Sequence, residues 1–257
     1  MKVAKTGILS LLALLVGISG FPQVQAKKKS KETLAVALLV IGKVDVLRNG
    51  RKKRVKTKMF FEKNDTIITS RNGKINLQIG PKAVIRVAPN SMVQLSKLAE
   101  IKRGEQIELT LKKGTIYSKI VRKLKGNEAF RVRTRTIVAA VRGTEFAFSN
   151  LNMDQDKIKD EENLSSGVYV NEGKVKVETN SGEKVDVSAG EEVRLTGAKL
   201  KKQILEAFVK RKLEIFKNLD VMKEQNYKML KAQKERGQKA LQKIFERNKQ
   251  LREKMNK

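Results

Sequence analysis

Short apolar stretches, separated by turn residues, run from residue 33 to residue 195 and limit the folds open to this chain. Within a stretch such as 74–79 (KINLQI), apolar and polar residues alternate, as in a strand with one buried face. Turn pairs such as Asn49-Gly50 and Asn72-Gly73 divide these stretches at intervals of about 8 to 12 residues. We place a further turn at Lys113-Gly114, between strands at 105–111 and 115–121. The pattern predicts a mostly β protein, an antiparallel β-sandwich or roll.

The segment 198–257 differs in kind, because apolar residues recur there at spacings of three and four and no proline occurs. It predicts a long amphipathic C-terminal α-helix, with Gly197 as the break before it and Gly237 as a weak point. The segment carries 19 Lys and Arg against 7 Asp and Glu, a net charge of +12. Self-association as a coiled coil and binding to another partner both remain open. The candidate electrostatic contacts are five basic residues: Lys210, Arg211, Lys212, Lys231 and Lys234.

Composition argues against most enzyme classes. The chain has no Cys and no His, so it lacks disulfides, thiolate metal sites, Cys nucleophiles and the commonest general base. Carboxylate pairs such as Glu105 and Glu108 have no recognisable catalytic partner. We therefore expect a non-catalytic protein without a cofactor or a metal ion. Its formal net charge of +30 points to anionic partners.

The N-terminus has the organisation of an export signal. Lys2 and Lys5 precede an apolar run over residues 8–18, and Val24-Gln25-Ala26 supplies small residues at a cleavage-site spacing. We predict a signal peptide over 1–26 and a basic linker over 27–33. The apolar run is too short for a permanent transmembrane helix. The expected location is the periplasm, the outer membrane or the cell surface, with an uncleaved signal anchor as the alternative.

Several ordered motifs resemble the FecR domain, a module of bacterial envelope proteins. Residues 64–69 (NDTIIT) are similar to its G-D-x-I-x-T box, with Asn64 in place of the usual Gly. Residues 130–134 and 141–146 resemble its F-x-V-x-T and V-R-G-T-x-F pieces, and 172–175 with 189–191 resemble its closing E-G-x-V and A-G-E hairpins. The resemblance covers residues 34–195 and implies a FecR-like β domain, which we bound at 34–197, ahead of the helical tail.

The V-R-G-T-x-F piece also has a physical interpretation. Gly143 permits a bulge or a close backbone approach, and Phe146 supplies an apolar anchor. Arg142 can donate to buried carbonyl groups at such an irregularity, and Thr144 can hydrogen-bond the same backbone. We interpret the four residues as a structural corner, with a ligand clamp as the alternative.

The acidic segment 152–163 begins like a calcium loop, with Asn152, Asp154 and Asp156 at the first three ligand positions. The sixth position is Lys157, where the EF-hand needs Gly, and the twelfth is Asn163, where it needs Glu. The EF-hand interpretation therefore fails. A solvated loop is the main expectation, and a weak surface calcium site is the alternative.

Together these features predict an exported envelope protein that acts as an interaction module, with a basic helix for docking or self-association. The partner would be an envelope protein, or an anionic envelope polymer or lipid surface; nucleic acid fits poorly with export and few aromatic residues. Polyanion or membrane-surface binding is one alternative function. The resemblance implies another, a periplasmic signalling component. We expect no sigma-factor control, because no cytoplasmic segment precedes the predicted export signal.

Overall fold

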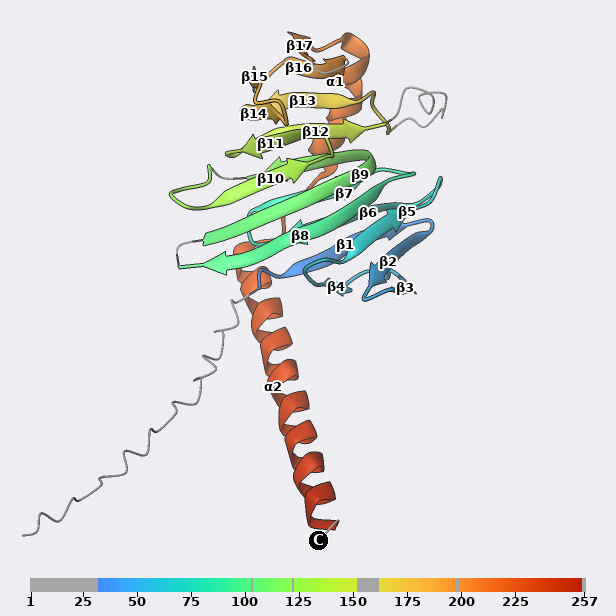
Figure 1. Ribbon diagram of the computed structural model, residues 1–257, viewed down its shortest axis with the longest axis vertical. Coiled ribbons are helices and arrows are strands. Elements are labelled where there is room, and N and C mark those ends of the chain that lie inside the picture. Colours follow the sequence, from blue (N-terminus) through green and yellow to red (C-terminus); the bar gives the residue numbers. More distant parts are fainter. Residues whose placement is uncertain (1–31, 103, 122, 152–161, 197–198, 256–257) are drawn as a thin grey trace, which may run out of the picture.

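The computed structural model describes residues 32–102, 104–121, 123–151, 162–196 and 199–255. The predicted signal peptide, most of the basic linker and most of the acidic segment 152–163 lie outside these residues. Within them the protein is mostly β, with one long C-terminal helix (Figure 1). This confirms the predicted fold class.

The strands form two sheets that share one strand. The first sheet has the order β3(Arg51–Arg54), β2(Val44–Arg48), β5(Thr66–Thr69), β8(Met92–Ile101), β9(Gly104–Ile120), β10(Ala129–Arg133), β11(Ile137–Val141), β14(Lys174–Thr179), β15(Lys184–Ser188). The second sheet has the order β4(Phe60–Phe61), β1(Ala35–Ile41), β6(Lys74–Ile79), β7(Ala83–Val87), β9, β12(Glu145–Asn150), β13(Gly167–Glu172), β16(Glu191–Thr196), β17(Lys199–Ile204). Neighbouring strands run antiparallel, except that β9 and β10 are parallel.

Strand β9 crosses from the first sheet to the second at Gly114. Up to Lys113 it pairs with β8, and from Gly114 onward it pairs with β12. Gly114 has a φ of +92°, and a Cβ atom there would lie 2.0 Å from the Oγ atom of Ser91. Only glycine fits this position. The expected turn at Lys113-Gly114 is therefore wrong: one continuous strand bends there and belongs to both sheets.

The two sheets face each other across a continuous apolar core. In β12, for example, Phe146 and Phe148 are fully buried in this core, and the intervening Ala147 points to the opposite face. The same alternation holds in β13, where Val168 and Val170 face the core. Period-two patterning thus sets which side chains lie between the sheets.

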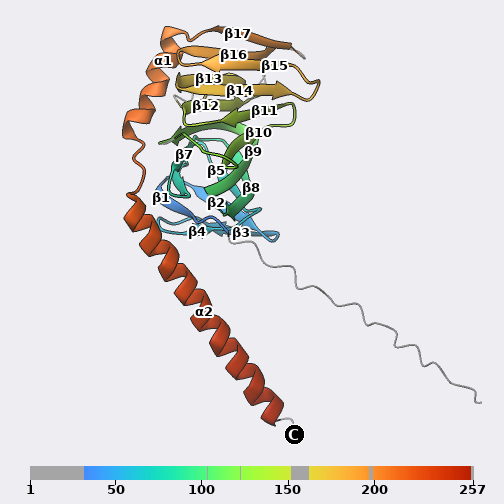
Figure 2. The same ribbon diagram turned by 90° about the vertical axis from the view of Figure 1, so that its left-hand side faces the viewer.

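The outer face of the second sheet is covered by the chain that follows β17. This strap, residues 205–223, contains α1(Ala207–Leu213) and the 3₁₀-helix η2(Glu214–Asn218) (Figure 2). It encloses a second apolar cluster with Tyr117 and Tyr169 from the sheet. The rings of Phe216 and Tyr117 meet edge to face, with 5.9 Å between their centroids. The second sheet is therefore buried on both faces, whereas the first has one face in solvent.

The C-terminal helix α2(Glu224–Met255) begins well after the expected start at residue 198. The expectation of a single helix from residue 198 is wrong for its first part, because β17 pairs with β16 and the strap follows. Lys-rich β17 is the edge of the second sheet, where charged side chains are tolerated and block further pairing. Gly237 lies inside α2 and does not interrupt it, since one glycine costs only about 1 kcal/mol in a helix.

Candidate interaction surface

The first turns of α2 are fixed to one end of the β domain. The buried Tyr227 accepts a hydrogen bond through its Oη atom from the backbone N–H of Leu34, at 3.1 Å. The same Oη atom lies 3.5 Å from a carboxylate oxygen of Glu105. Lys231, one turn further along the helix, forms an ion pair with Glu100. These contacts in the first two turns fix the direction of the helix.

Glu105 has an unusual environment beneath this helix. Burial raises its pKa from 4.5 to about 7, and the nearby lysines Lys231 and Lys82 offset only part of that effect. Burial, followed by the charge of Glu105, also raises the pKa of Tyr227, which therefore stays a neutral phenol. Near neutral pH the carboxyl group of Glu105 is therefore close to the midpoint of its titration, beside a neutral Tyr227 and the Lys231–Glu100 ion pair.

Beyond this junction α2 projects away from the β domain into solvent (Figures 1 and 2). From residue 235 to residue 255 every side chain is exposed. This distal segment nevertheless carries large apolar residues, which are between 50% and 84% exposed: Leu241, Ile244, Phe245, Leu251 and Met255. Residues three, four and seven apart share one face of a helix, so these side chains form a stripe. An exposed apolar stripe on a projecting helix has the character of an interaction surface.

The five predicted electrostatic contacts divide into two groups in the structure. Lys210 and Arg211 of α1 are exposed. The other three turn toward the protein itself: Lys212 donates to the backbone carbonyl of Asn163, Lys231 pairs with Glu100, and Lys234 lies 5.5 Å from the Phe60 ring centroid. The basic residues of the distal segment, such as Arg247 and Arg252, were not singled out by sequence. Their positions beside the apolar residues of the predicted helix could have identified them as candidate contacts.

The V-R-G-T-x-F corner holds three segments together. The Nε atom of Arg142 donates to the carbonyl of Leu124 at 2.8 Å, and the Thr144 hydroxyl donates to the carbonyl of Lys174 at 3.2 Å. Gly143 has a φ of +78°, and Phe146 is fully buried. All four residues thus make contacts within the fold, which agrees with a structural corner. The alternative, a ligand clamp, stays a prediction.

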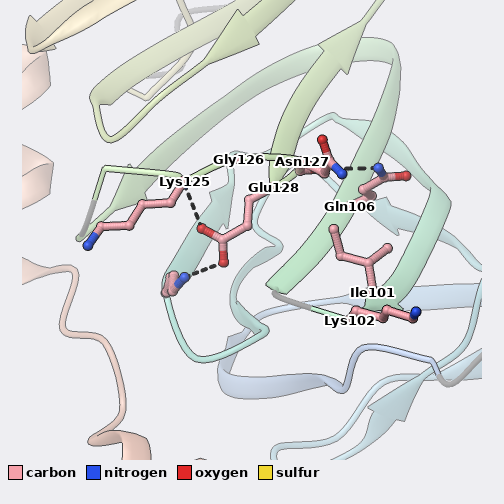
Figure 3. A pocket seen from close by; sticks show the side chains of 8 residues that line it. Ile101, Lys102, Gln106, Lys125, Gly126, Asn127 and Glu128 are labelled. Carbon is pink, nitrogen blue, oxygen red and sulfur yellow. Dashed lines mark hydrogen bonds and ion pairs between the residues drawn. The ribbon is translucent and has the colours of Figure 1, made fainter.

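The cavity drawn in Figure 3 lies between the end of β8, the start of β9 and the loop before β10. Its volume is about 1060 Å³. Two contacts join its polar lining groups: Lys82 forms an ion pair with Glu128, and the Gln106 amide donates to the Asn127 carbonyl at 3.2 Å. Glu128 also accepts a hydrogen bond from the backbone N–H of Lys125 (Figure 3). These contacts join the loop before β10 to the sheet at the edge of the cavity.

The described residues show neither a metal-binding cluster nor a membrane-spanning helix. They contain no cluster of three acidic, His or Cys side chains that could hold a metal ion. None of the helices they form is both long enough and apolar enough to cross a membrane. The acidic segment singled out in the sequence lies outside them, apart from residues 162 and 163.

Comparison with known proteins relates the β domain to one family. Residues 65–176 match the family model described as FecR protein. The match runs from β5 into the first half of β14, and it includes the shared strand and the V-R-G-T-x-F corner. The match covers less than half of the chain and confirms the resemblance to the FecR domain that the sequence motifs predict. No curated protein sequence matches the chain.

Two crystal structures of a candidate anti-sigma factor from Parabacteroides distasonis, at 2.50 Å and 1.65 Å resolution, are similar to the chain. Their TM-scores are 0.43 and 0.42, and their sequence identities are 16% and 18%. Each alignment covers 55% of this chain and 60% of the other, so the chain spans less than two thirds of these neighbours.

Proposed function

We propose that this protein is a non-catalytic interaction module of the bacterial envelope, in which the FecR domain carries and orients a docking helix. The observation that carries the proposal is the projecting, solvent-exposed part of α2 with its apolar stripe. Apolar side chains exposed together on one helix face gain free energy when a partner covers them. The fixed junction at Tyr227 and Lys231 supports a presented surface, because it holds the helix away from the domain.

The envelope location in this proposal has two supports, the FecR domain and the pattern of residues 1–26. FecR-type proteins are envelope-associated and regulatory, and they interact with other envelope or signalling proteins. They are not known as enzymes, which agrees with a chain that lacks His and Cys. A role as a periplasmic signalling component is the second candidate, and the family match favours it.

The test is cross-linking of the full chain to envelope fractions at low and at physiological salt. We expect discrete cross-linked partners that persist at physiological salt, since apolar contacts are insensitive to screening. The variant Ile244→Asp should lose them, because it puts a charge into the apolar stripe. Gln250→Asp is the matched control, with the same change of charge outside the stripe.

Three results would reject the proposal. Capture that Ile244→Asp and Gln250→Asp reduce equally would mean that the stripe is not the contact. Recovery of the mature protein from the cytoplasm after fractionation would remove the envelope location. Binding that disappears entirely with salt would favour the polyanion alternative instead.

A further inference from the structure

The distal part of α2 carries a heptad seam. Leu241, Ile244, Asn248, Leu251 and Met255 are separated by three, four, three and four residues, the spacing of the a and d positions of a coiled coil. The four apolar members are at least half exposed. Asn248 stands at an a position inside this seam, where a buried Asn fixes register and the number of strands. This spacing allows the seam to pack against a second helix in a coiled coil.

The charges beside the seam are sorted by sign. Arg247 and Lys254 occupy g positions and Arg252 occupies an e position, so basic side chains flank the seam. The acidic residues of the same stretch, Glu246 and Glu253, occupy f positions on the opposite side of the helix. Flanking e and g charges decide which helix can pair with which. This arrangement selects a partner with acidic flanks.

The residues of the seam and its flanks disfavour two other partners, a second copy of this chain and a lipid surface. In a parallel pair of identical chains, Arg247 of one helix would face Arg252 of the other, on both sides of the seam. A lipid surface would attract the basic residues, and Phe245 widens the apolar face, but Asn248 lies at the centre of the seam, where an amide would enter the apolar layer. A second copy and a bilayer therefore fit less well than an acidic helix.

We propose that the distal segment of α2 binds an amphipathic helix with acidic e and g positions, forming a two-stranded coiled coil. This inference rests on the proposed function and specifies its partner. Burial of the seam supplies the affinity, and the basic flanks supply partner choice and a faster encounter. The pairing tolerates physiological salt, because the apolar seam carries most of the binding.

The experiment uses the full chain and two synthetic peptides about four heptads long. Both peptides carry Leu at a and d with one Asn at a; one has Glu at every e and g position, and the other has Lys. Titration calorimetry measures their affinities. We expect the Glu peptide to bind about tenfold or more tighter than the Lys peptide, from the sum of several flank pairs. Ile244→Asp should abolish binding, whereas Gln250→Asp should not.

A charge-exchange variant keeps the test independent of folding. The double change Arg247→Glu and Arg252→Glu leaves the seam intact and should reverse the preference, so that the Lys peptide binds better. Circular dichroism checks that each variant retains its helix. Loss of all binding without reversal would contradict the assigned flanks.

Three other outcomes would show that an acidic helix is not the partner of the seam. Equal affinity for both peptides would overturn the proposal. So would a dimer of the full chain in sedimentation velocity that Ile244→Asp disrupts, or binding to phosphatidylglycerol vesicles in preference to the Glu peptide. If Ile244→Asp abolishes envelope cross-linking but the Glu peptide does not bind, the proposed function stands and the acidic-helix inference fails.

Discussion

Phe216 anchors the strap to the outer face of the second sheet, and its removal has a predictable cost. Its side chain is 2% exposed, contacts Tyr117 edge to face, and lies in the smaller apolar cluster. Replacing a buried Phe with Ala costs about 3–5 kcal/mol, which includes the lost transfer free energy and the cavity. We expect Phe216→Ala to lie at the lower end of this range, because the strap can detach before the domain unfolds.

Urea denaturation of the full chain measures this loss, and hydrogen exchange locates it. Amides of α1 and η2 should lose protection in Phe216→Ala, whereas amides of β9 inside the sheets should keep theirs. Phe208→Ala is the matched control, because Phe208 belongs to the same strap but is 56% exposed. It should change the free energy of unfolding by no more than about 0.5 kcal/mol. Equal losses from both variants would refute the assignment of the strap's anchor.

Three further perturbations follow from the structure. The pKa of Glu105 is raised from 4.5 to about 7. The protonated carboxyl group therefore stabilises the fold, on the order of 3 kcal/mol, below pH 4.5, and this contribution is lost as the pH rises through 7. Glu105→Gln should flatten this pH dependence of the free energy of unfolding, measured by urea titrations between about pH 4 and pH 8. Gly114→Ala should prevent soluble expression or lower the melting temperature severely, because its Cβ would collide with Ser91. Glu162→Ala should cost about 2–3 kcal/mol by thermal unfolding, because it leaves the guanidinium of Arg86, now bound at 2.8 and 2.9 Å, without its carboxylate.

Local patterns in the sequence were sufficient to predict most strands of the β domain and the fold class. Alternation over 74–79 and the Asn49-Gly50 turn correspond to β6 and to the β2–β3 hairpin. The crossing of β9 was not predictable in this way. A glycine after a lysine has the same local signature whether the chain reverses or bends between two sheets, and only the pairing of distant strands distinguishes them.

The tail shows the same limit. Lys199–Ile204 consists of residues that suit a helix, yet the exposed edge of β16 provides backbone partners that stabilise a strand. The strap likewise depends on the apolar outer face of the second sheet around Tyr117, which no local pattern reveals. In contrast, the stripe from Leu241 to Met255 could be predicted from its helical spacing, which is a local property of the sequence. In the structure these side chains are exposed.

The central claim, that the seam face of α2 is the contact surface, can be tested directly by site-specific photocrosslinking in cells that express the full chain. A photoreactive residue replaces Ile244 in one protein and Gln250 in another, so that one probe lies on the seam and the other about 120° around the same exposed helix. The account predicts a discrete adduct from position 244 and none from position 250. Adducts of equal yield from both positions, or from neither, would contradict it.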